Sequence, residues 1–152
     1  MGKLTDALPK PMLSVGGKNL LEYKMDALPS EIDEVVMVVG YLAEKIIEYF
    51  GDVYEGKKIL YVHVDPEKEL LGTGYALWKA KDVLHDRFLV MMGDDIYNKE
   101  DIQKCIQSEW SILVHKVSEM KSGGKVVLDG NGNHAPSVCL GLIGKRGGGG
   151  RK

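Results

Sequence analysis

Val35-Val36-Met37-Val38-Val39 is a continuous apolar run and the strongest secondary-structure signal in this 152-residue chain. Five apolar, mostly β-branched side chains in a row are typical of a strand that is buried on both faces, as in a parallel sheet. Residues 42–50 then place apolar side chains at the spacing of one helix face, and Gly51 follows as a helix stop. A buried strand followed by an amphipathic helix predicts a βα unit.

The same alternation continues on both sides of this unit. We expect further strands at 59–64, 88–92, 112–117 and 124–128, and further helices at 20–28, 73–84 and 101–108. Helices that alternate with short apolar strands imply right-handed crossovers between parallel strands. The predicted fold class is therefore α/β.

Composition excludes several classes of protein. Hydrophobic residues make up 44% of the chain and charged residues 28%, as in ordinary globular domains. No apolar run approaches the roughly 20 residues of a membrane span, so we expect no membrane partner. The chain has 2 cysteines, too few for a disulfide framework, and a reduced cytoplasmic setting is the expectation.

Glycine and charge are unevenly distributed along the chain. Of the 19 glycines, 10 lie in the last 30 residues, where residues 142–152 carry 4 basic side chains and no acid. We expect 131–152 to be a disordered, glycine-rich basic tail, because such a segment cannot bury a core. The remainder is net acidic, which makes nucleic acid an unlikely main partner.

Three loops carry residues that suit phosphate or metal chemistry. Gly93 and Asp94 follow the expected strand at 88–92, where a carboxylate could approach a metal, although the sequence suits a plain turn equally well. Gly72 and Thr73 open a helix whose N-terminus could face an anion, and a start capped by Thr73 is equally compatible. Lys10 is held between two prolines, yet its local sequence alone favours a solvated lysine.

Taken in order, these loops resemble the sugar-1-phosphate nucleotidyltransferase family, of the glucose-1-phosphate thymidylyltransferase-like kind. Five blocks carry the resemblance: Thr5-Asp6 and Pro9-Lys10-Pro11-Met12 up to Leu20-Leu21-Glu22-Tyr23, Ile32-Asp33-Glu34-Val35-Val36, Gly40-Tyr41-Leu42-Ala43-Glu44, Leu71-Gly72-Thr73-Gly74, and Phe88 to Tyr97. The similarity extends from about residue 4 to about residue 130, so we interpret 1–130 as a partial nucleotidyltransferase domain. It implies a Rossmann-like, open and mostly parallel sheet with helices on both faces.

The resemblance also implies a reaction and residues for it. Family members join an NTP to a sugar-1-phosphate, release pyrophosphate and need Mg²⁺. By position, Lys10 takes the catalytic role of holding the phosphates, and Asp94 takes the role of metal ligand. Gly72 and Thr73 take the nucleotide-binding role beside the base.

Departures from the family pattern set limits on activity. Only Gly2, Lys3 and Leu4 precede the first block, so we expect the family's first strand and most of its Gly-x-Gly-Thr-Arg-Leu loop, with the arginine, to be absent. A second Mg²⁺ carboxylate is not found downstream. Each lost transition-state contact costs on the order of 100- to 1000-fold in rate, so we expect this chain alone to be weakly active or inactive.

The same departures bear on stability and on partners. A central strand with about four buried side chains is worth roughly 6–12 kcal/mol, and whole domains are stable by only about 5–15 kcal/mol. We therefore expect a marginal fold unless a second copy or a complementing chain supplies a strand. The alternative function is a non-catalytic nucleotide-binding or regulatory subunit of the same family.

Overall fold

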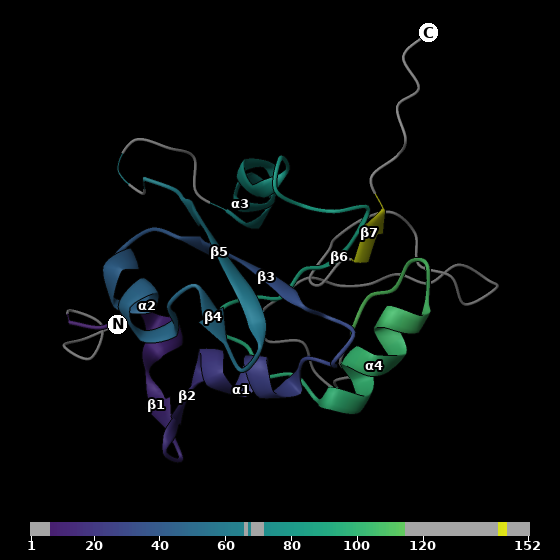
Figure 1. The fold of residues 1–152 in the computed structure, drawn as a ribbon, viewed down its shortest axis with the longest axis horizontal. Helices are drawn as coiled ribbons and strands as arrows, with labels where there is room; N and C mark the ends of the chain where they lie inside the picture. Colours follow the sequence, from purple (N-terminus) through teal and green to yellow (C-terminus); the bar gives the residue numbers. More distant parts are fainter. Residues whose placement is uncertain (1–6, 66, 68–71, 115–142, 146–152) are drawn as a thin grey trace, which may run out of the picture.

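Helices and strands alternate along the chain in the computed structural model, which describes residues 7–65, 67, 72–114 and 143–145 (Figure 1). In chain order the elements are η2 (Lys10–Met12), β1 (Ser14–Val15), β2 (Lys18–Asn19), α1 (Leu20–Ala27), β3 (Glu34–Val39), α2 (Ala43–Phe50), β4 (Val53–Tyr54), β5 (Lys57–His63), α3 (Thr73–Ala80), β6 (Arg87–Leu89), α4 (Lys99–Gln107) and β7 (Ile143–Lys145). No helix in the described part of the chain has the length and apolarity to cross a membrane.

The βα unit predicted from the apolar run is the centre of the fold. β3 leads through α2 to β5, and the two strands pair in parallel with Val35 opposite Ile59 and Met37 opposite Tyr61. β4 adds to the other edge of β5 in antiparallel fashion, which gives the strand order β3-β5-β4. Since β3 lies at the end of this order, one of its edges has no strand partner among the described residues.

Helices cover both faces of this sheet, which confirms the α/β class. On one face, α1 and α2 form the core with the sheet, and its buried side chains are Met12, Met25, Met37, Val39, Ala43, Ile46, Phe50 and Ile59. On the other face lies α3, which contacts β3 (Figure 1). The alternation of side chains along β3 explains this division, because successive residues of a strand point to opposite faces.

Local chemistry sets the bounds of the two core helices. The Asn19 side chain accepts a hydrogen bond from the Glu22 amide at 2.9 Å, and Glu22 accepts one from the Asn19 amide at 2.7 Å. This reciprocal capping box starts α1. α2 ends at Gly51, whose φ of 59° lies in the left-handed region that favours glycine.

The main differences between the expected elements and the structure lie in the second half of the chain. β6 ends at Leu89 rather than at residue 92. α3 ends at Ala80 rather than at residue 84, and turns with hydrogen bonds between residues three positions apart follow it up to Val83. Residues 112–114 of the expected strand at 112–117 form no strand, and 115–117 lie outside the described residues. Within the expected tail, β7 pairs with β6 in antiparallel fashion. The expected strand at 124–128 lies outside the described residues, and the boundary at residue 130 stays a prediction.

Candidate active site

Lys10 and Asp94 form an ion pair that joins two loops lying 84 positions apart in the sequence. Lys10 begins the short helix η2. Pro9 is the N-cap of this helix and Pro11 is its second residue, and the two prolines restrict the backbone around Lys10. Asp94 lies in the turn that follows the apolar residues 88–92. The Lys10 ammonium beside Asp94 holds the pKa of that carboxyl below its usual range.

Exposure makes this ion pair easy to separate. The side chains of Lys10 and Asp94 are 42% and 36% exposed, so water screens their attraction. Exposed pairs of this kind contribute only about 0–1 kcal/mol to stability. Each partner is therefore available to a charged ligand at low energetic cost.

The two loops also pack closely at Gly93 and Pro11, the neighbours of Asp94 and Lys10. A Cβ atom added at Gly93 would lie 3.2 Å from the Pro11 Cγ atom, which is tighter than ordinary van der Waals contact. A side chain at this position would require Pro11 to shift by a few tenths of an ångström. Glycine before Asp94 thus has a packing reason, beyond its suitability for a turn.

Gly72 and Thr73 lie beside the same turn. Gly72 is the N-cap of α3 and has a φ of 132°, a backbone conformation that residues with a side chain rarely adopt. No side chain among the described residues donates or accepts a capping hydrogen bond at the start of this helix. Thr73 is the first helical residue rather than the cap, and its hydroxyl lies 3.7 Å from the Met92 Sδ atom. The structure therefore brings all four residues singled out in the sequence to one region, although Leu71 lies outside the described residues.

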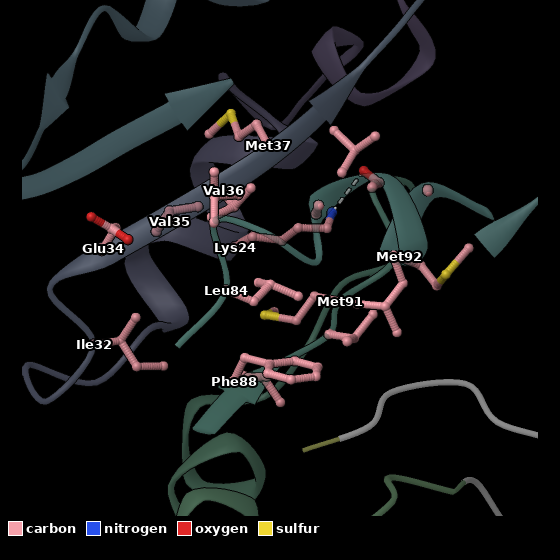
Figure 2. Close-up of a pocket in the computed structure, with 18 of the residues that line it drawn as sticks. Lys24, Ile32, Glu34, Val35, Val36, Met37, Leu84, Phe88, Met91 and Met92 are labelled. Atoms are coloured by element: carbon pink, nitrogen blue, oxygen red, sulfur yellow. Dashed lines mark hydrogen bonds between the residues drawn. The ribbon is translucent and has the colours of Figure 1, made fainter. Parts of the chain in front are cut away.

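A cavity of about 850 Å³ opens behind this region, between β3 and residues 87–93. Its walls are mainly apolar and come from β3, α1, α3 and the segment that leads to Gly93 (Figure 2). Both Pro11 and Thr73 line it, so the candidate site lies at one end of the cavity. Glu34 lies at the other end, with its carboxylate 2.8 Å from Lys58 and 3.0 Å from His85.

Two further residues hold the turn, and the sequence analysis did not single out either. Lys24 from α1 donates a hydrogen bond to the carbonyl of Gly93 at 2.9 Å (Figure 2). Tyr97 accepts one from the Met92 amide at 2.9 Å, and burial raises the pKa of its hydroxyl. The signal for Lys24 is its position in the stripe Leu21-Lys24-Met25-Leu28, where helical spacing otherwise places apolar side chains.

The donor set at the turn fits a phosphate-bound magnesium ion. Asp94 and its neighbour Asp95 supply hard carboxylate oxygens. Among the described residues, no three His, Cys, Asp or Glu side chains are grouped so that they could hold a metal by themselves. Mg²⁺ usually takes one or two carboxylates together with substrate phosphates, and that arrangement is what Asp94 and Asp95 can offer.

Comparison with known proteins agrees with the fold and with the sequence blocks. The GlmU bifunctional protein of Methanocaldococcus jannaschii is 33% identical over 130 residues, which are 86% of this chain and 30% of that protein. The UTP–glucose-1-phosphate uridylyltransferase AglF of Haloferax volcanii is 38% identical over 96 residues, which are 62% of this chain and 38% of that protein. This chain thus spans about 30% of the length of the GlmU relatives it matches.

A solved structure and a family model complete the comparison. The crystal structure of HddC from Yersinia pseudotuberculosis is similar with a TM-score of 0.63 at 22% identity, over 94% of this chain and 70% of that chain, which is a likeness of fold. The sequence model of the family described as "Nucleotidyl transferase" matches residues 2–132. The resemblance carried by the five blocks is therefore confirmed, and the chain belongs to the nucleotidyl transferase family.

Proposed function

We propose that this chain carries the nucleotide site of a nucleotide-sugar nucleotidyltransferase, which converts an NTP and a sugar-1-phosphate into an NDP-sugar and pyrophosphate. The observation that carries the proposal is the Lys10–Asp94 pair beside Gly72 and Thr73. An ammonium group that can bind phosphate, a carboxylate that can bind a metal and a helix N-terminus that can face the base lie in one region. The similarity to the uridylyltransferase AglF and to GlmU adds support from relatives.

Each residue has a task in this reaction. The sugar phosphate oxygen attacks the α-phosphorus of the NTP, and the bond from that phosphorus to the bridging oxygen of pyrophosphate breaks. Lys10 leaves Asp94 and holds the phosphate oxygens, while Asp94 and Asp95 are the residues that would hold Mg²⁺. Mg²⁺ bound there would neutralise phosphate charge. Gly72 and Thr73 present the start of α3 to the base.

Turnover by this chain alone is expected to be low. The sequence contains no Gly-x-Gly-Thr-Arg motif that could surround the triphosphate with backbone amides and an arginine. Missing donors lower the rate more than they lower ground-state binding, because catalysis depends on contacts made in the transition state. Binding of nucleotide without turnover is therefore the alternative function, that of a non-catalytic subunit. We place either role in the cytoplasm, where the buried Cys105 thiol stays reduced.

One pair of measurements tests the proposal and separates the alternatives. The purified chain is incubated with Mg²⁺, glucose-1-phosphate and each of the four common NTPs, and pyrophosphate release and melting temperature are recorded. A rise in melting temperature with one NTP supports the site, because a ligand that binds only the folded state stabilises it. Pyrophosphate release then decides between enzyme and binding subunit. No rise and no release with any NTP would refute the proposed function.

A further inference from the structure

Lys24 is a charged residue in an apolar place. The residue is 6% exposed, and it belongs to α1 on the side that lines the cavity. Burial lowers the pKa of its ammonium, and the charges of Asp95 and Asp94 partly offset this effect. Lysines are almost never buried unless they are paired, so a reason for this position has to be found in its contacts.

The contacts of Lys24 lead to the candidate active site. Its ammonium donates to the carbonyl of Leu20, one turn earlier in the same helix, at 3.1 Å. It also donates to the carbonyl of Gly93, 69 positions away, at 2.9 Å. In Figure 2 the side chain runs from α1 across the wall of the cavity to the end of the segment that carries Met92.

Geometry connects this hydrogen bond to Asp94. The Gly93 carbonyl and the Asp94 amide belong to the same planar peptide unit. A donor that fixes the carbonyl therefore fixes the plane from which the Asp94 side chain leaves the backbone. Lys10 cannot fill this role, because it is exposed and pairs with the carboxylate itself. The hydrogen bond from Lys24 to Gly93 does not involve Lys10, so it does not depend on Lys10 remaining at Asp94.

We propose that Lys24 is a positioning residue, which holds the Gly93 carbonyl so that Asp94 faces a divalent cation bound with nucleotide. The inference rests on the proposed function for the identity of the ligand, whereas the effect of Lys24 on the turn does not. Hydrogen bonds that orient a metal ligand from behind are commonly worth 10- to 100-fold in metal affinity, and we expect about tenfold here.

A matched pair of variants separates positioning from simple structural support. Lys24→Met removes the hydrogen-bond donor and keeps an unbranched side chain of similar length. Lys57→Met is the control, because Lys57 also donates to two backbone carbonyls, those of Pro29 at 3.0 Å and Ile32 at 2.5 Å, away from Asp94. Lys24→Arg keeps donors at the site. If Lys24→Met does not fold, Lys24→Gln, with a shorter reach to Gly93, replaces it under the same criteria.

The experiment measures Mn²⁺ affinity by electron paramagnetic resonance in the presence of the stabilising NTP, and melting temperature alongside. We expect Lys24→Met to lose about tenfold in Mn²⁺ affinity with a melting temperature no lower than that of Lys57→Met. Lys24→Arg should restore most of the affinity, and Lys57→Met should bind as the unaltered chain does. Unchanged Mn²⁺ affinity in Lys24→Met would overturn the inference.

A ligand-free readout keeps the inference separate from the proposed function. The amide NMR signals of residues 93–95 are compared among the unaltered chain, Lys24→Met and Lys57→Met without nucleotide or metal. Should the unaltered chain bind no Mn²⁺ and no NTP, the proposed function fails. In that case, signals that shift only in Lys24→Met would still support the inference that Lys24 positions the turn. Signals that do not shift would overturn it.

Discussion

Gly93 connects the packing of the site to its chemistry at the scale of single residues. An added methyl group would meet Pro11 at 3.2 Å, and the residue beyond Gly93 is Asp94. We predict that Gly93→Ala pushes the Lys10–Pro11 segment away from Asp94, weakens nucleotide binding roughly tenfold and costs about 1–3 kcal/mol of stability. Calorimetric titration with nucleotide and urea unfolding measure the two effects.

Gly74→Ala is the control for the stability measurement. Apart from the adjoining residues and the backbone of the helix itself, no atom of the described residues lies within 4 Å of a Cβ built at Gly74, which is a helical position in α3. Alanine should therefore raise stability there by about 0.5–1 kcal/mol through helix propensity. Equal stability of Gly93→Ala and the unaltered chain would show that the contact with Pro11 is not tight.

Glu34 gives a prediction of pH dependence at the same scale. Lys58, which donates to its carboxylate, holds the pKa of Glu34 below its usual range, and His85 adds to this effect. A lowered folded-state pKa means that the contribution to stability is present above the unfolded pKa of about 4.3 and is lost as the pH falls through the folded value. The melting temperature of Glu34→Gln should therefore lie below that of the unaltered chain at pH 6, and the gap should close towards pH 3. A gap that widens on acidification would contradict this sign.

The sequence could predict the residues with distinctive neighbours and not those defined by distant contacts. Local sequence left the roles of Lys10 and Asp94 open, the resemblance to the family assigned them, and the structure places the two side chains in contact. Lys24 was missed because its partner Gly93 lies 69 positions away. A lysine in an apolar helical stripe was nevertheless visible, and in a helix of a binding domain such a lysine merits attention as a buried donor.

At the scale of elements, patterns contained within a few residues predicted the structure best. β3, α2 and β5 follow from one apolar run, one helical stripe and a second apolar run. The hairpin of β1 and β2 and the short strand β4 were not predicted, since two-residue strands have no periodicity to detect. Their turns did carry a signal: Gly16 and Gly17 have φ values of 62° and 93°, and Gly56 has 79°.

The capping box of α1 gives the prediction at this scale. Asn19→Ala removes the acceptor for the Glu22 amide and leaves that amide at the helix start without its partner. We expect a loss of about 1 kcal/mol in the free energy of unfolding. Urea unfolding measures this loss, with Ser30→Ala as a control because the exposed Ser30 hydroxyl makes only a 3.3 Å contact with Glu31. Equal losses in both variants would argue against a cap at Asn19.

At the scale of the whole molecule, the cavity explains why parts of two apolar runs are only half-buried. Continuous apolar sequences at 35–39 and 88–92 predict strands buried on both faces. In the structure Val36 and residues 88–92 are intermediate in exposure and face one another across the cavity, where β3 has no second strand partner among the described residues. An apolar run indicates that a strand can be buried on both faces. The neighbouring strands determine how much of its surface is in fact buried.

This cavity predicts a marginally stable protein with accessible apolar surface. We expect a free energy of unfolding near or below about 5 kcal/mol, the lower end of the range for domains. We also expect the folded chain to bind the dye ANS under native conditions, because the cavity walls are apolar and reachable. Urea unfolding and ANS fluorescence check these two expectations. High stability together with no ANS binding would mean that the cavity is closed in solution.

The role of the Lys10–Asp94 pair is tested by the affinity for nucleotide with Mg²⁺. This affinity is compared among the unaltered chain, Lys10→Met, Asp94→Asn and Lys18→Met. Lys18 is the matched control, since its ion pair with Asp26 has exposures of 49% and 35%, close to those of the Lys10–Asp94 pair. We predict that calorimetric titration shows at least a roughly tenfold loss for Lys10→Met and for Asp94→Asn, and none for Lys18→Met. Equal affinities in the unaltered chain and all three variants would contradict the account.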